Sequence, residues 1–384
     1  MNYLRQYKVM GAVFAVALFC LAIMGDYKLL VFYVKDEVDY NEWVVGTTDA
    51  LETDYITNFY EKLQFVNFNG FVRKMFGQHR MNGVIKLNNG YLMKEIQEAN
   101  HEILFENAQD VKRLEQYVSA WGGAVLYVTV PYVVSKYDSQ LPLGVWDYGN
   151  ENLDFMREKI EELGIPSLDL REKIYETGVS QYDLWYKTDH HWSTQGGFYA
   201  YTIMAEYLEE IGWAGLDDKI RDMANYEVIT YDKWHLGSNG QRTGIAYAGI
   251  DDFDLILPKF ETHIENLNNG NTGNFQEVCL NMSALSNRNY ASRYTYDSVM
   301  GGSAGDFHND DAQCDKKVLI LGDSMSSAVC PYLILSFGDI RSRGNYLVPV
   351  VSRAYLDEYQ PDLVILMYYP DRISERSAFD FDLY

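Results

Sequence analysis

Three short runs of apolar residues limit what this chain can fold into. They occupy residues 124–130, 317–321 and 362–367, and Pro131 closes the first. Each has the length of a strand and shows no apolar–polar alternation, which is the pattern of a strand buried on both faces of a parallel sheet. Such a sheet needs helices on both faces, so helical segments are expected between the runs.

Apolar residues recur at helical spacing in the segments between these runs. The clearest cases begin near Asn107 and Leu153 and span residues 194–211, and glycines follow each helical pattern. Residues 165–168 form a further apolar run, expected to pair beside the strand at 124–130. The alternation predicts an α/β fold of the doubly wound type, a parallel sheet with helices on both faces.

Two other regions carry weaker signals. Residues 83–93 place apolar residues on both sides of Asn89-Gly90, which predicts a β-hairpin. Residues 213–316 are rich in Asn, Gly and Asp and contain short mixed segments. We expect a β-rich insertion or long surface loops there.

The N-terminus carries a targeting pattern. Arg5 and Lys8 precede an uncharged apolar run at residues 9–25. A basic start before such a run places the N-terminus in the cytoplasm and the remainder outside. No small-residue cleavage pattern follows, so we expect an uncleaved anchor and an extracytoplasmic location, at the cell surface or in the periplasm. The predicted parts are an anchor or transmembrane helix at 1–30, a stalk or lead-in at 31–70, and a catalytic domain at 71–384.

Charge and cysteine content narrow the function classes. The formal net charge is -23, which disfavours nucleic acid as a partner because phosphate binding needs a surplus of Lys and Arg. Cys279, Cys314 and Cys330 lie beyond the predicted anchor, and their spacing fits no zinc pattern. A Cys279–Cys314 disulfide is left open. No cofactor and no metal are expected.

A serine follows the second apolar run. The sequence Gly322-Asp323-Ser324 stands where a buried strand is expected to turn into a helix. Ligands bind at that edge of open α/β sheets, and the Ser324 amide at a helix start can face a developing oxyanion. The position suits a nucleophile, although Asp323 or Ser324 can also serve only as a helix cap.

The base for this serine must come from upstream, because none of the seven histidines follows it. Residues 188–192 read Thr-Asp-His-His-Trp and open the helix at 194. Asp189 and His191 are two residues apart, so in an extended segment their side chains point to the same side. Asp189 can then orient His191 as the base for Ser324. His190 is expected to point away and to be structural.

These motifs together resemble the DHHW and alginate O-acetyltransferase-like group of the SGNH hydrolase superfamily. The resemblance extends over most of residues 83–373 and rests on Thr-Asp-His-His-Trp, Gly196-Gly197 and the much later Gly-Asp-Ser. It implies a triad of Ser324 as nucleophile, His191 as general base and Asp189. It also implies a periplasmic or cell-surface O-acetyltransferase, often served by a membrane-bound O-acyltransferase that supplies acetyl groups.

The chain departs from the wider superfamily in two ways. The Asp-x-x-His pair near the C-terminus is missing, and so is the Gly-x-Asn-Asp block that supplies an oxyanion-hole asparagine. We assign the oxyanion hole to the Ser324 amide and Asn345. Trp192 is expected to shape the cleft. Arg372 is expected to bind an acidic sugar or an oxyanion, with a surface ion pair as the alternative.

We therefore expect an enzyme that transfers acetyl groups to a polysaccharide or cell-wall glycan through an acetyl-serine intermediate. Three alternatives stay open. One is a carbohydrate acetylesterase with the same triad. Another is a non-catalytic sugar-binding surface protein, and the last is a metal phosphoesterase, because Asp-His-His also occurs as a metal-binding motif.

Overall fold

The computed structural model describes residues 62–213, 215–288, 290, 295–344 and 350–383. Contacts divide the chain into two units, Met1–Asn69 and Gly70–Tyr384. The predicted anchor at 1–30 lies outside the described residues, as does most of the predicted stalk. Within the described ranges, no helix combines the length and apolar character that a membrane crossing requires.

A mixed sheet of eight strands forms the centre of the second unit. Five strands run parallel, in the spatial order β5, β4, β14, β11 and β12, and β10, β8 and β9 extend the sheet antiparallel beyond β12. The predicted parallel sheet is thus present, and three antiparallel strands from the region of the predicted insertion extend it on one side. The strands are β5 (Ser167–Asp169), β4 (Ala124–Thr129), β14 (Leu363–Tyr368), β11 (Cys314–Gly322), β12 (Phe337–Gly344), β10 (Asp306–Asn309), β8 (Ile264–Asn266) and β9 (Asn271–Gly273).

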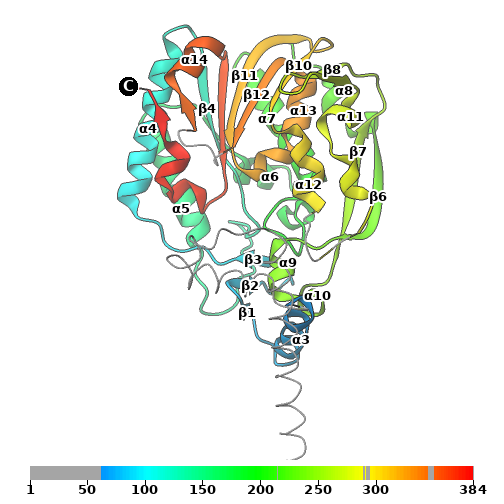
Figure 1. Ribbon diagram of the computed structural model, residues 1–384. Coiled ribbons are helices and arrows are strands. Elements are labelled where there is room, and N and C mark those ends of the chain that lie inside the picture. Colours follow the sequence, from blue (N-terminus) through cyan, green and yellow to red (C-terminus); the bar gives the residue numbers. More distant parts are fainter. Residues whose placement is uncertain (1–61, 214, 289, 291–294, 345–349, 384) are drawn as a thin grey trace, which may run out of the picture. The chain divides into compact units, whose positions relative to one another are not determined.

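The three apolar runs form the strands β4, β11 and β14 in the middle of this sheet. Every residue of β14 is buried, and β14 pairs with β4 on one side and β11 on the other. Burial of consecutive residues means that both faces of the sheet are covered. Two sets of helices pack there, α4 (His101–Ser119) with α5 (Tyr148–Glu162), and α6 (Leu170–Glu176) with α7 (Thr194–Glu210) and α13 (Cys330–Ser336) (Figure 1).

The remaining strands form small sheets. The predicted hairpin is present as β2 (Val84–Lys86) and β3 (Leu92–Lys94), joined by β1 (Arg80–Met81) in a sheet of its own. A longer ribbon pairs β6 (Tyr226–His235) with β7 (Asp251–Pro258), and α9 (Ser238–Thr243) and α10 (Ile245–Ala248) lie in its connection. The predicted insertion at 213–316 thus contains this ribbon and three strands of the central sheet.

Further helices and strands complete the described part of the chain. They are α3 (Lys62–Met75), α8 (Asp218–Arg221), α11 (Phe275–Cys279), α12 (Thr295–Met300), α14 (Arg353–Tyr359), β13 (Val351–Ser352) and β15 (Phe381–Asp382). Cys279, Cys314 and Cys330 are buried free thiols, so the disulfide left open by the sequence is not formed.

Candidate active site

Ser324 stands at the carboxyl end of β11, at the middle of the sheet. The chain turns there into the 3₁₀ helix η5 (Ser324–Ala328), and α13 follows. The Asp323 carboxylate accepts hydrogen bonds from Met325 N at 2.9 Å and from Tyr369 N at 2.6 Å, beyond β14. Asp323 therefore caps the turn and ties it to the neighbouring strand, which fixes the direction of the serine.

The two ends of the loop that carries Asp189 and His191 are joined to each other. Trp185 and Trp192 form an isolated antiparallel bridge, and their rings lie 5.8 Å apart. Ser193 then caps α7 by accepting a hydrogen bond from Gly196 N at 3.0 Å. The first turn of α7 packs on η5, because a Cβ at Gly197 would lie 2.3 Å from Ala328 Cβ. The loop and the serine turn are thus held against each other.

The structure brings Ser324, His191 and Asp189 into one chain of contacts. His191 Nε2 lies 2.6 Å from Ser324 Oγ, within hydrogen-bond reach. On the other side of the ring, His191 Nδ1 lies 3.2 Å from Asp189 Oδ2, a charge contact without a well-aligned hydrogen bond. Tyr296 stacks on the His191 ring at 4.3 Å and donates to the Ser324 carbonyl at 3.0 Å. This is the geometry of a nucleophile, a base and an orienting acid.

Asp189 is fully buried and heavily supported. Its Oδ1 accepts hydrogen bonds from His190 N at 2.7 Å and from Ser238 Oγ at 2.9 Å, and His235 Nε2 lies 2.9 Å from its Oδ2. Gly237 allows this approach, because a Cβ there would lie 2.3 Å from Asp189 Cβ. The carboxylate is therefore fixed from several sides.

These contacts set the charges of the site. Burial alone would raise the pKa of the Asp189 carboxyl, but the charge of His191 and the surrounding hydrogen bonds lower it well below its ordinary value. Burial opposes protonation of His191, yet Asp189 raises the pKa of its imidazole overall. Asp297 acts in the same direction, with Oδ1 3.6 Å from His191 Nε2. The site thus favours the imidazolium that proton transfer from a serine would create.

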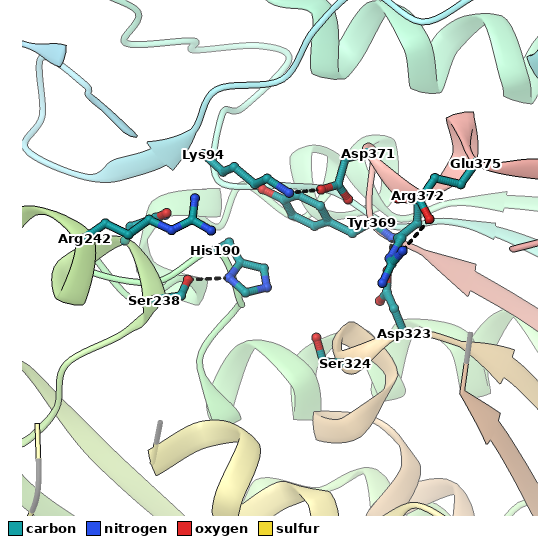
Figure 2. A pocket seen from close by; sticks show the side chains of 11 residues that line it. Lys94, His190, Ser238, Arg242, Asp323, Ser324, Tyr369, Asp371, Arg372 and Glu375 are labelled. Carbon is teal, nitrogen blue, oxygen red and sulfur yellow. Dashed lines mark hydrogen bonds and ion pairs between the residues drawn. The ribbon is translucent and has the colours of Figure 1, made fainter. Parts of the chain in front are cut away.

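Ser324 lies between two hollows. The first, of about 320 Å³, is polar and is also lined by His190, Arg242 and Tyr369 (Figure 2). Two ion pairs, Lys94–Asp371 and Arg372–Glu375, stand on its wall. Arg372 makes the ion pair that was considered for it, while its binding of an acidic sugar or an oxyanion stays a prediction.

The second hollow, of about 560 Å³, lies on the side of η5. It is lined by Gly322, Ser326, Ser327 and Gly344, together with Asp297. The proposed oxyanion donor Asn345 follows Gly344 directly but lies outside the described residues. The role of the Ser324 amide stays a prediction.

Two site expectations were wrong. Trp192 does not face the cleft: it is fully buried, and its Nε1 donates to Met325 O at 3.0 Å, so it anchors the serine turn. His190 does not point away: it lines the first hollow beside Ser324. Its Nδ1 lies 2.7 Å from Ser238 Oγ.

Sequence reasoning missed the supports of the loop. His235 ends β6 and reaches Asp189, while Asp251 begins β7 and accepts hydrogen bonds from Thr188 N at 2.8 Å and Lys187 N at 3.1 Å. Their only sequence signal was a single His and one Asp of an Asp-rich segment, in a region without clear periodicity. Gly237 and Ser238, which follow His235 closely in the sequence, also contact Asp189.

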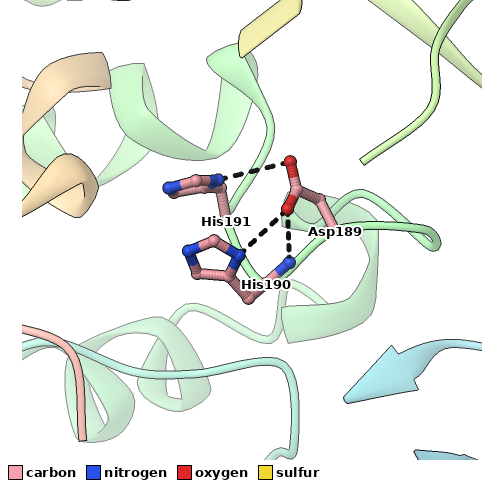
Figure 3. A group of neighbouring side chains, drawn as sticks. All are labelled: Asp189, His190 and His191. Atoms are coloured by element: carbon pink, nitrogen blue, oxygen red, sulfur yellow. Dashed lines mark hydrogen bonds and ion pairs between the residues drawn. The ribbon is translucent and has the colours of Figure 1, made fainter. Parts of the chain in front are cut away.

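Asp189, His190 and His191 are close enough together to hold a cation (Figure 3). Their atoms have other partners, however. Asp189 Oδ2 faces His191 Nδ1 and His235 Nε2, and His190 Nδ1 faces Ser238 Oγ. A metal would have to displace these contacts, so the donor set fits a triad with its supports better than a metal centre.

Two family models match the chain. Residues 91–224 match an SGNH hydrolase-like domain described as acetyltransferase AlgX, and residues 171–342 match the DHHW protein model. Together the two models span residues 91–342, and this part of the chain resembles the DHHW and AlgX-like group of SGNH proteins. Both matched segments contain residues 188–192, and the second extends through Ser324. No curated protein sequence matches the chain.

Solved structures share the fold of this chain. Bacillus cereus PatB1 with a sulfonyl adduct superposes with a TM-score of 0.60 at 18% identity, over 79% of this chain and 99% of PatB1. A DHHW family protein from Eubacterium siraeum gives a TM-score of 0.57 at 15% identity, over 78% of this chain and 94% of that protein. Identities this low show a common fold alone.

Proposed function

We propose that this protein is an O-acetyltransferase that acetylates hydroxyl groups of a polysaccharide or cell-wall glycan through an acetyl-Ser324 intermediate. The observation that carries the proposal is the contact chain from Ser324 Oγ through His191 to Asp189. Similarity to a family model described as an SGNH hydrolase-like acetyltransferase domain supports the acyl-transfer chemistry.

In the proposed mechanism, each residue has a part in two half-reactions. Ser324 Oγ attacks an acetyl ester, His191 Nε2 takes the hydroxyl proton and passes it to the leaving group, and Asp189 stabilises the imidazolium. An acceptor hydroxyl then attacks the acetyl carbon and gives its proton to His191. His191 returns that proton to Ser324 Oγ as the ester bond to serine breaks.

The location and the donor are part of the proposal. The basic and apolar N-terminal sequence supports an anchored protein whose catalytic domain is extracytoplasmic. Acetyl groups would then come from a membrane-bound O-acyltransferase, because cytoplasmic donors do not reach that compartment.

Mass spectrometry of the protein after exposure to p-nitrophenyl acetate tests the proposal. We expect one added acetyl group on the peptide that contains Ser324, and none in Ser324→Ala. Ser326→Ala is the matched control, because this serine lies in the same turn and its hydroxyl donates to Asp323 O at 2.8 Å. Acetylation that persists in Ser324→Ala would contradict the proposal.

A second measurement separates transferase from esterase. The acetylated protein is supplied with glycans, and free acetate and acetylated glycan are both quantified. A transferase passes a larger fraction of its acetyl groups to the glycan than the fraction that glycan hydroxyls make up of all hydroxyl groups, water included. Release of acetate alone with every glycan would identify an acetylesterase with the same triad.

A further inference from the structure

Asp189 holds two imidazoles side by side. The rings of His190 and His191 lie 3.8 Å apart between centroids, at an interplanar angle of 39°. Figure 3 shows that each ring turns one nitrogen toward Asp189 and its other nitrogen away from it. The triad uses only one of these rings, because His191 alone contacts Ser324 Oγ.

The hydrogen bonds around His190 define its tautomer. Ser238 Oγ donates its single hydrogen to Asp189 Oδ1 at 2.9 Å. At 2.7 Å from that hydroxyl, His190 Nδ1 must therefore be the donor to Ser238 Oγ. A neutral imidazole with hydrogen on Nδ1 carries its free lone pair on Nε2.

The free nitrogen of His190 is directed into the polar hollow. Figure 2 shows its Nδ1 toward Ser238 and its other ring nitrogen toward the space shared with Ser324. The hollow, about 320 Å³, lies within the size range of small-molecule sites. Two neighbouring imidazoles thus present Nε2 acceptors, one at the serine and one beside it.

Two acceptors on neighbouring rings suit a group with two neighbouring hydroxyls. The two oxygens of a vicinal diol are separated by about one hydrogen-bond length, and each carries one hydrogen to donate. We infer that the polar hollow is the acceptor site and that it recognises a vicinal diol of a sugar ring. His190 Nε2 accepts a hydrogen bond from one hydroxyl, which places the neighbouring hydroxyl for attack on acetyl-Ser324. The inference rests on the proposed function.

In the transfer step, His190 acts only as a binding group, and every bond and proton is accounted for without it. The attacking oxygen forms a bond to the acetyl carbon, and the bond from that carbon to Ser324 Oγ breaks. The proton of the attacking hydroxyl moves to His191 Nε2 and then to Ser324 Oγ. His190 gains and loses no proton, and its partner hydroxyl remains unreacted.

A competition between two small acceptors tests this inference. The protein is given p-nitrophenyl acetate with trans-1,2-cyclohexanediol and cyclohexanol at equal hydroxyl concentration, and the two acetylated products are quantified. Both acceptors compete for the same acetyl-serine, so the ratio of the two products does not depend on how fast Ser324 is acetylated. We expect the wild-type protein to favour the diol.

Two variants provide a matched pair. In His190→Asn the amide stands near the place of Nδ1 and can still meet Ser238, but nothing replaces Nε2. In His190→Gln the amide oxygen reaches the place of Nε2. We expect the diol preference to fall about tenfold in His190→Asn, the effect of one hydrogen bond. His190→Gln should retain most of the preference.

The outcomes separate this inference from the proposed function. A purely structural role of His190 would lower both products together and leave the ratio unchanged in both variants, which would overturn the inference. Equal use of diol and mono-alcohol by the wild-type protein would overturn it as well. Absence of acetyl-Ser324 in the wild-type protein would instead remove the proposed function.

Discussion

Asp189 determines how the charges of the site respond to pH. It keeps its negative charge although it is buried, because three imidazoles, a hydroxyl and two backbone amides surround it. Its charge in turn raises the pKa of His191 above the ordinary value of 6.5. A buried charge of this kind is stable only while its partners remain in place.

The pH dependence of kcat/KM follows from this pair. His191 must be neutral to take a proton from Ser324, so activity should fall as the pH drops through the raised pKa, with a midpoint above 6.5. Asp189→Asn should move that midpoint to lower pH and reduce kcat about 10,000-fold, as in related triads. Initial rates with p-nitrophenyl acetate across pH check both. A wild-type midpoint below 6.5 would show that Asp189 does not control His191.

The Gly237 backbone packs directly against Asp189. In Gly237→Ala the new Cβ would lie 2.3 Å from Asp189 Cβ, so the acid must shift. We expect kcat to fall at least about 100-fold, because small misplacements of a catalytic group have effects of that size. Gly301→Ala is the control, since its Cβ would meet nothing within 4 Å. Equal rates for the two variants would argue against a fixed Asp189.

Elements with long, regular patterns were predictable from the sequence. The helical spacing of Val111, Leu114 and Val118 identified α4, and all three are fully buried in it. The strand β12 went unnoticed because charged residues at positions 339, 341 and 343 leave it without a continuous apolar run. β8 and β9, of three residues each, are too short for a period to show.

The site was only partly predictable for a similar reason. Ser324 and Asp189-x-His191 could be found because each belongs to a short local pattern. His235, Asp251 and Tyr296 act through contacts that span tens to more than a hundred residues of sequence. No local pattern reports such contacts, and the burial of Trp192 likewise depends on tertiary packing.

At the scale of the whole molecule, stability should depend on the middle of the sheet. Ile365 in β14 is fully buried, with parallel strands on both sides. Ile365→Ala should lower the free energy of unfolding by about 2–5 kcal/mol, measured by urea denaturation. Val228→Ala, at a side chain 41% exposed in β6, should change it by less than about 0.5 kcal/mol. Similar losses in both variants would mean that the sheet does not dominate stability.

Removal of metal ions from the whole protein tests whether it is a metalloenzyme. If Asp189, His190 and His191 act as a triad with its supports, prolonged dialysis against EDTA should leave the rate with p-nitrophenyl acetate unchanged. A metal phosphoesterase would lose its activity under this treatment and would keep it in Ser324→Ala. Loss with EDTA that added zinc or manganese restores would revive the metal interpretation.

The β6–β7 ribbon and its connection form one segment of the chain that supports the catalytic acid. His235 and Asp251, which hold the two sides of the acid loop, are partners in the ribbon's register, and Gly237 and Ser238 lie in the connection between them. One continuous stretch of about thirty residues therefore carries most supports of the catalytic acid. A chimera that exchanges residues 226–258 with a relative would transplant these supports together, whereas exchange of either strand alone would separate them.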